Sequence, residues 1–327
     1  MHAQAKIAAA LLSALIVVGL RGSAAAQDYP ARTVTIITPA AAGGGIDLTA
    51  RQIAAELQNA LGKPFVVENK GGASGNLGTL DVARAAPDGY TLLLTISGYQ
   101  ATNPALFKSL QWDPVRDFAA VAMISRSYHV LVVRNDFPAN TLAELIAYAR
   151  ANPGKLNYGS PGVGTQTHIG SELLAQMANI KVVAVPYRGT GPALTDLLGG
   201  TLGFFVNTTQ QLIGPLQGHA VKALAIMSPT RHPLLPDVPT TAEAGLPGLE
   251  IDTWYALYAP AGTPKTIVDL LGREVKKITE NADFKARVEQ TGATISYMGP
   301  DELAKYTAQE VVHWTAIIRK LGIPAQP

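Results

Sequence analysis

The sequence predicts an α/β protein that is divided into two lobes. Segments of β-branched residues repeatedly run into a glycine-containing loop and then into a helix, which is the pattern of a parallel sheet covered by helices. The chain has 327 residues, of which 47% are hydrophobic, and this is more than a single core usually holds. Two apolar stretches, Val121–Val133 and Glu250–Ala259, are suited to carry the chain to the second lobe and back. We expect lobe 1 at residues 27–127, lobe 2 at 128–250, and a return to lobe 1 with C-terminal helices at 251–327.

Residues 1–26 have the features of a secretory signal peptide. Lys6 precedes the apolar run Ile7–Leu20, and Ala24–Ala26 supplies the small residues of a cleavage site. The run is shorter than the ~20 residues that a spanning helix needs. We therefore expect export, with cleavage before Gln27.

Composition excludes several classes of function. Removal of residues 1–26 takes away Lys6, Arg21 and no acid, so the formal charge of +2 becomes zero and a nucleic-acid partner is not expected. The chain has no cysteine, which excludes disulfides, thiolate nucleophiles and zinc–thiolate clusters. The histidines after the signal peptide lack the spacing of metal ligands, and no phosphate-binding loop motif occurs. We expect neither a metal nor a cofactor.

The first half contains three strand–loop–helix units. The expected strands are Val34–Ile37, Pro64–Asn69 and Gly89–Ile96. The first is followed by Gly43, Gly44, Gly45 and an amphipathic helix from Asp47. The second is followed by the loop 70–78 and a helix over 81–86, and the third by the loop 97–104. Three such units in a row predict a parallel sheet whose ligand lies outside the carboxyl ends of the strands.

The second half repeats this order and then becomes mainly helical. Val121–Val133 is expected as one or two strands, interrupted near residues 125–127, and Thr141 with Glu144 forms a capping box that starts a helix. Further strands are expected at 156–159, 182–186, 202–206 and 221–227. The expected helices are 169–179, 193–198, 266–280, 283–290 and 301–321.

Five loops of similar construction, residues 38–47, 70–78, 97–104, 159–168 and 187–192, are candidates for a binding cleft. Glycines let several main-chain N–H groups converge beside a helix N-terminus, which favours an anionic ligand, although the first loop alone is equally compatible with a simple turn. Asp47 fits a helix cap. Arg188 is either a clamp for a carboxylate or a solvated charge.

A hydrolase is a second hypothesis. Tyr158-Gly-Ser-Pro-Gly162 approaches a nucleophile elbow but has Tyr at the position of the first glycine. Ser160 and His168 are the candidate nucleophile and base, and no orienting acid is evident. We therefore expect that the chain is not an enzyme.

Six blocks spread over the chain resemble the Bug family, the periplasmic solute-binding receptors of tripartite tricarboxylate transporters. The blocks are Tyr29-Pro-Ala-Arg-Thr-Val-Thr-Ile-Ile-Thr-Pro39, Gly43-Gly-Gly-Ile-Asp-Leu-Thr-Ala-Arg51, Val67-Glu-Asn-Lys-Gly-Gly-Ala-Ser-Gly-Asn76, Pro87-Asp-Gly-Tyr-Thr-Leu92, Val185-Pro-Tyr-Arg-Gly189 and Ala259-Pro-Ala-Gly-Thr-Pro264. The resemblance implies a type II periplasmic binding protein fold, in which two lobes with mixed sheets close around a ligand cleft. It also implies a monomer in the periplasm that delivers a small organic carboxylate to membrane permease subunits.

The resemblance places the ligand between the first glycine loop and the loop Ser160–His168, with further contacts at the cleft rim. The expected ligand-binding residues are Ala41, Ala42, Gly43, Gly44, Gly45, Asp47, Ser97, Ser160, Gly164, Thr165, His168, Arg188, Gly189 and Asn207. Members of the family often have bulkier residues or proline where this chain has Ala40–Ala42. The expected pocket is therefore roomier, which leaves aromatic or longer dicarboxylic ligands open. A ligand-responsive sensor that binds the same carboxylate is an alternative role.

Overall fold

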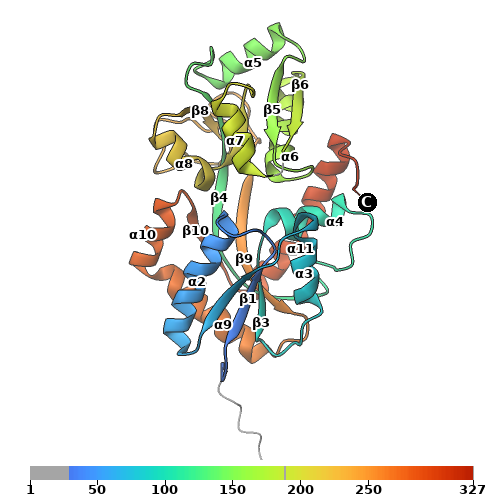
Figure 1. Ribbon diagram of the computed structural model, residues 1–327, viewed down its shortest axis with the longest axis vertical. Helices are drawn as coiled ribbons and strands as arrows, with labels where there is room; N and C mark the ends of the chain where they lie inside the picture. Colours follow the sequence, from blue (N-terminus) through green and yellow to red (C-terminus); the bar gives the residue numbers. More distant parts are fainter. Residues whose placement is uncertain (1–28, 188, 327) are drawn as a thin grey trace, which may run out of the picture.

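The computed structural model describes residues 29–187 and 189–326 and has two lobes that are joined by two long strands (Figure 1). The expected signal peptide at 1–26 and the expected ligand contact Arg188 lie outside the described residues. Among the described residues, no helix has the length and apolar character needed to cross a membrane.

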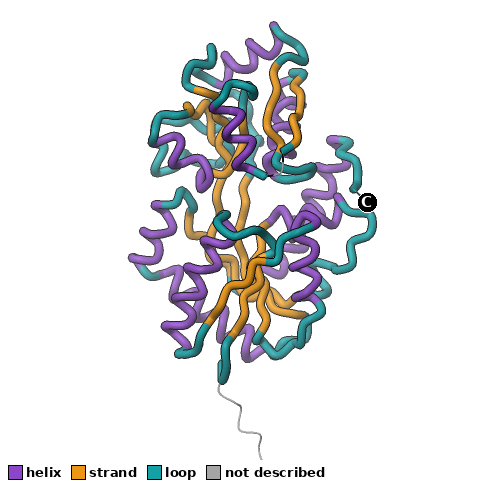
Figure 2. The backbone as a smooth tube through the Cα atoms, viewed as in Figure 1, coloured by secondary structure: helices purple, strands orange, loops and turns teal. Residues whose placement is uncertain are grey.

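Lobe 1 is built on the sheet that the first three strand–loop–helix units predict. Strands β1 (Val34–Thr38), β2 (Phe65–Asn69) and β3 (Thr91–Ile96) are parallel, with β1 in the middle. The apolar side chains of β1 and β3 are mostly buried on both faces, as central strands of a parallel sheet require, whereas the edge strand β2 is partly exposed. Helices cover this sheet, and Figure 2 shows them on both sides of the central strands. These helices are α2 (Gly45–Leu61), α3 (Asn76–Ala83), α9 (Lys265–Glu280), α10 (Ala282–Gln290) and α11 (Pro300–Leu321).

The rest of the lobe 1 sheet is antiparallel. Strand β9 (Asp252–Pro260) pairs with β3 on one side and with β4 (Phe118–Arg134) on the other, and β10 (Thr294–Met298) pairs with β4. After β3 the chain forms a π-helical turn at Gly98–Thr102 and the short helix α4 (Asn103–Leu106). The sheet is therefore mixed, as expected, although the sequence pattern did not predict β10.

Lobe 2 is built around the C-terminal part of β4, residues 129–134. Strands β7 (Phe205–Thr208) and β8 (Val221–Ile226) pair antiparallel with β4, while β5 (Leu156–Ser160) and β6 (Val182–Pro186) form a separate parallel pair. Its helices are α5 (Leu142–Ala151), α6 (Gln166–Ala178), α7 (Thr190–Leu198) and α8 (Thr209–Gln217). Thr141 caps α5 as predicted, because the Glu144 N–H donates to the Thr141 hydroxyl at 3.2 Å. The Glu144 carboxylate accepts from the Asn140 N–H at 2.6 Å instead of from the Thr141 N–H that a capping box would use.

Strand β4 is continuous through both lobes, so the expected break near residues 125–127 is wrong. Its register shifts between Ala120 and Ala122 and between Met123 and Ser125, and the irregularities let one strand bend instead of ending. The polar residues at 125–127 suggested a break, but Arg126 and Ser127 have side-chain partners in neighbouring elements. Arg126, for example, forms an ion pair with Asp252 on β9 at 3.1 Å.

Candidate functional site

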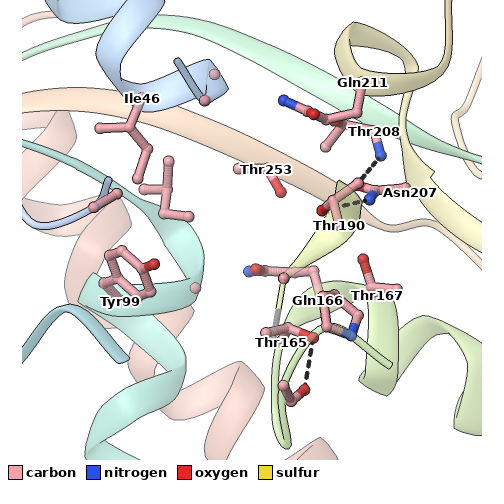
Figure 3. Close-up of a pocket in the computed structure, with 18 of the residues that line it drawn as sticks. Ile46, Tyr99, Thr165, Gln166, Thr167, Thr190, Asn207, Thr208, Gln211 and Thr253 are labelled. Atoms are coloured by element: carbon pink, nitrogen blue, oxygen red, sulfur yellow. Dashed lines mark hydrogen bonds between the residues drawn. The ribbon is translucent and has the colours of Figure 1, made fainter. Parts of the chain in front are cut away.

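A cleft of about 590 Å³ lies between the lobes, at the carboxyl ends of the parallel strands. In Figure 3, Ile46 and Tyr99 from lobe 1 lie on one side, and Thr165, Gln166, Thr167, Thr190 and Asn207 from lobe 2 lie on the other. The lining also includes residues of β4 and β9, which form the connection between the lobes. The volume falls within the range of pockets that enclose small organic molecules.

Two loops, one from each lobe, have the same local structure. Gly43 and Gly164 each lie two residues before the first residue of a helix, α2 or α6, and have φ of 85° and 76°. The Gly43 N–H donates to Asp47 Oδ2 at 3.0 Å, and the Gly164 N–H donates to His168 Nδ1 at 2.9 Å. In each case the acceptor is the third residue of the helix. The side chain of that residue therefore fixes the loop, and the positive φ explains why glycine is needed at both positions.

The two helix N-termini present unpaired main-chain donors to the cleft. Among the described residues, the N–H groups of Gly45 and Ile46 on α2, and of Gln166 and Thr167 on α6, have no hydrogen-bond acceptor. All four residues line the cleft. Unpaired N–H groups and the helix dipole together favour an anion at each terminus.

Several side chains connect the lobes across the cleft. Gln166 Nε2 donates to Ser97 Oγ at 2.8 Å, and the Tyr255 hydroxyl donates to Gln210 Oε1 at 2.7 Å. Main-chain packing is also close, since a Cβ atom on Gly164 would lie 2.1 Å from Leu106 Cδ1 of lobe 1. The structure thus shows lobes in direct contact on the side of α4 and α6.

The lining of the cleft combines apolar side chains with uncharged polar groups. Among the described lining residues there is no Lys, Arg, Asp or Glu. Burial lowers the pKa of His129 to about 3, so this lining histidine is neutral at physiological pH. Asp47 lies behind the lining. Burial would raise the pKa of Asp47, but hydrogen bonds from Arg51, Gly43 and Asn69 lower it below its usual value, so the carboxylate stays charged. An anion in this cleft therefore depends on N–H and O–H groups.

Most of the residues expected to bind the ligand line the cleft. They are Ala41, Ala42, Gly43, Gly44, Gly45, Gly164, Thr165, Gly189 and Asn207. Four other expected residues do not line the cleft but hold its loops from behind: Asp47, Ser97, Ser160 and His168. Asp47 and His168 accept from the glycine N–H groups described above. Ser97 accepts from the Gln166 amide, and the Ser160 hydroxyl donates to the Gly162 carbonyl at 3.1 Å. Arg188 is outside the described residues.

The geometry gives no support to the hydrolase hypothesis. The Ser160 hydroxyl donates to the Gly162 carbonyl, and His168 Nδ1 accepts from the Gly164 N–H. Burial lowers the pKa of His168, although the nearby Glu172 opposes this effect. Both side chains are committed to the loop and are not hydrogen-bonded to each other, which a nucleophile–base pair requires.

Apart from Asn207 on β7, sequence reasoning missed the lining residues that come from strands. These include His129 on β4, Thr208 at the end of β7, and Thr253 and Tyr255 on β9. A polar side chain in an otherwise apolar strand is a usable signal, and His129 directly precedes four fully buried apolar residues, 130–133. Of the aromatic side chains near this region, Tyr99 lines the cleft, whereas Trp254 is part of the core.

The family model described as "Tripartite tricarboxylate transporter family receptor" matches residues 49–323. The chain belongs to this receptor family. The receptor is also similar to solved structures over nearly its whole length. Rpa4515 of R. palustris with adipate is 33% identical, with a TM-score of 0.86 over 91% of this chain and 100% of that one. The periplasmic binding protein BugD is 36% identical, with a TM-score of 0.82 over 91% and 100%.

A third structure, MatC from Rhodopseudomonas palustris with bound malate, is 35% identical to the receptor, with a TM-score of 0.80 over 89% and 100% of the two chains. These similarities confirm the expected Bug-type family and the fold of a periplasmic binding protein with two α/β lobes. They also confirm that the chain is a solute-binding receptor and not an enzyme.

Proposed function

We propose that the receptor captures a small organic carboxylate between the N-termini of α2 and α6 and delivers it to a tripartite tricarboxylate-type permease. The observation that carries the proposal is the set of four unpaired N–H groups on the two helices, at Gly45, Ile46, Gln166 and Thr167. Each helix belongs to a different lobe. A carboxylate held by both makes its full set of contacts only when the lobes are together, and the ligand therefore favours the closed form.

The ligand class is supported by the chemistry of the lining and by the solved relatives. Rpa4515 and MatC are described with adipate and malate, which are both dicarboxylates. The cleft of about 590 Å³, with Ala40, Ala41 and Ala42 on its wall, has room for a ligand longer than malate. We favour a dicarboxylate or an aromatic carboxylate, bound by main-chain N–H groups at its charged end.

The remaining parts of the proposal concern location and domain organisation. Export rests on the signal-peptide pattern at residues 1–26 and on the type of family, and the receptor then acts in the periplasm as a monomer. The proposed lobes are 27–127 with 251–327, and 128–250. N-terminal sequencing of the protein from a periplasmic fraction is expected to begin at Gln27.

Gly44 allows a sharp test of the anion site. It is the N-cap of α2, has extended angles of φ −86° and ψ 175°, and an added Cβ would have only the Ala41 carbonyl oxygen within 4 Å, at 4.0 Å. Asp is a favoured N-cap residue, so Gly44→Asp is expected to preserve or raise the melting temperature. It also places a carboxylate where the ligand carboxylate is proposed to bind. Gly44→Ala adds the Cβ without the charge and is the matched control.

Isothermal titration calorimetry on ligand-stripped protein measures the effect. Succinate, malate, adipate and benzoate are compared with their neutral amides. We expect saturable binding of at least one carboxylate, none of the amides, and an affinity at least about tenfold lower for Gly44→Asp than for Gly44→Ala. Equal affinities of the two variants, or the absence of binding by every carboxylate, would contradict the proposal. In a strain lacking the receptor, uptake of the labelled ligand should be restored by the wild type and not by Gly44→Asp.

A further inference from the structure

A second polar region of the cleft lies at the base of lobe 2, away from the two helix N-termini. His129 on β4 and Thr208 on β7 are directly opposite each other in the antiparallel pair. The His129 N–H donates to the Ile251 carbonyl, and the His129 carbonyl accepts from the Met227 N–H. Neither main-chain group of His129 is therefore bonded to β7. The two residues therefore form a non-hydrogen-bonded pair, in which the side chains of an antiparallel sheet come closest.

Both side chains are buried and carry a polar atom without a partner. The exposed fractions of His129 and Thr208 are 2% and 5%, and both residues line the cleft. Among the described residues, neither His129 Nδ1 nor Thr208 Oγ1 has a hydrogen-bond partner. Buried polar atoms are nearly always paired, and leaving one unpaired is costly. Both atoms are themselves closed to solvent, so a molecule in the cleft reaches them only when the two side chains rotate. Two such atoms on facing residues of one cleft are suited to a bound molecule that supplies their missing partners.

The surroundings of the pair suit a neutral group better than a second carboxylate. Near the start of α8, the Thr208 N–H donates to Asn207 Oδ1 at 2.7 Å and the Gln210 N–H donates to Ser127 Oγ at 3.1 Å. Thr209 is fully buried, so among the described residues the first turn of α8 offers the cleft one free main-chain donor, the N–H of Gln211. His129 is neutral because burial lowers its pKa, and a weaker backbone interaction with Ile251 does not offset this. A carboxylate would be buried here without a cation or several N–H groups, which is unfavourable.

A hydroxyl group matches the pair. It donates one hydrogen bond and accepts another, and a neutral imidazole and a threonine hydroxyl provide one acceptor and one donor. We propose that His129 and Thr208 form a subsite for a hydroxyl group of the ligand, and that the receptor therefore prefers hydroxylated carboxylates. This inference rests on the proposed function, since it assigns a second contact to the same ligand.

The test compares ligands that differ only in the hydroxyl group. Succinate with malate, and adipate with 3-hydroxyadipate, are titrated calorimetrically into ligand-stripped receptor. For the pair that binds more tightly, we expect the hydroxylated member to bind at least about tenfold better, because the unhydroxylated one leaves two buried polar atoms unpaired. Thr208→Val keeps the shape but removes the hydroxyl, and it should reduce this preference to within about twofold.

Thr95→Val is the matched control. The Thr95 hydroxyl on β3 is also fully buried and has no partner among the described residues, but Thr95 does not line the cleft. The control should keep the preference of the wild type. His129→Phe is the second variant, checked for folding by circular dichroism, and it should also reduce the preference. Binding of carboxylates without a preference, or a preference that survives both Thr208→Val and His129→Phe, would overturn the subsite alone. Failure of all carboxylates to bind would overturn the proposed function with it.

Discussion

The two matched glycines, Gly43 and Gly164, give a direct measure of the packing between the lobes. Replacing either with alanine imposes the same backbone cost, since both have positive φ, and this is roughly 1–2 kcal/mol. Both substitutions keep the N–H that bonds to Asp47 or His168. The surroundings differ: a Cβ on Gly43 has no atom within 4 Å, whereas one on Gly164 lies 2.1 Å from Leu106 Cδ1 and 2.8 Å from Leu106 Cγ.

Carbon atoms in contact prefer separations of about 3.5–4.0 Å, so the clash in Gly164→Ala requires a movement of more than about 1 Å. Leu106 is 1% exposed and has little room to rotate. Overpacking of this kind typically costs about 1–3 kcal/mol. We expect Gly43→Ala to reduce the free energy of unfolding by about 1–2 kcal/mol, and Gly164→Ala to reduce it by about 2–5 kcal/mol.

Urea denaturation followed by tryptophan fluorescence measures both changes. Leu106→Ala removes the atoms that clash, so in a double-mutant cycle it should recover at least about 1 kcal/mol of the cost of Gly164→Ala. It should not affect the cost of Gly43→Ala. If the two glycine variants are equally stable, or if Leu106→Ala gives no recovery, the lobes do not pack at this point as the structure shows.

Three further predictions follow from individual side chains. Asp47→Asn replaces a buried carboxylate that accepts hydrogen bonds from Gly43, Arg51 and Asn69. The substitution should lower the free energy of unfolding by roughly 2 kcal/mol. An unchanged denaturation midpoint would show that the Asp47 carboxylate does not stabilise the loop. The pKa of His129 is about 3 in the native state and ordinarily about 6.5, so the unfolded chain takes up a proton that the native chain does not. Stability should therefore fall as the pH falls from 6.5 towards 3, by roughly 2 kcal/mol at pH 5, and this contribution should be absent in His129→Phe. Burial raises the pKa of Asp252 to about 6, so protonation of this carboxyl stabilises the native state as the pH falls from 6 towards 3.8. This effect is the same in the wild type and in His129→Phe, and it cancels when their stabilities are subtracted. Thr208→Val should stabilise the ligand-free receptor by up to about 1 kcal/mol in thermal denaturation, because the hydroxyl that it removes has no partner; a loss of stability would mean that the hydroxyl is paired in solution.

The fold and half of the site could be predicted because they depend on local pattern. Apolar strands that end in glycines before a helix predict the parallel sheet, and Gly43 and Gly164 mark the two loops whose positive φ excludes most other residues. The role of Asp47 as a helix-start acid was also predictable. In the structure Asp47 accepts a hydrogen bond from the Gly43 N–H, and the two residues are only four positions apart in the sequence.

The residues that could not be predicted come from long-range pairing. His129 and Thr208 meet only because β4 and β7 pair in one register, and Tyr255 reaches Gln210 only because the chain returns on β9. Strand β10 was missed for the same reason, since its pairing with β4 spans about half of the chain and its residues are only half-buried. Sequence periodicity carries no information about which strands become neighbours.

The adjacency of the two crossing strands has a consequence for recombination between relatives. Tyr128 on β4 and Asp252 on β9 are paired, and the next residues inward are also joined, because the His129 N–H donates to the Ile251 carbonyl at 2.9 Å. The two ends of the segment 129–251 are therefore hydrogen-bonded to each other where the chain passes between the lobes. A chimera that exchanges this segment needs two junctions on neighbouring strands. It would carry α6, His129 and Thr208 as one unit while keeping the α2 terminus of the parent.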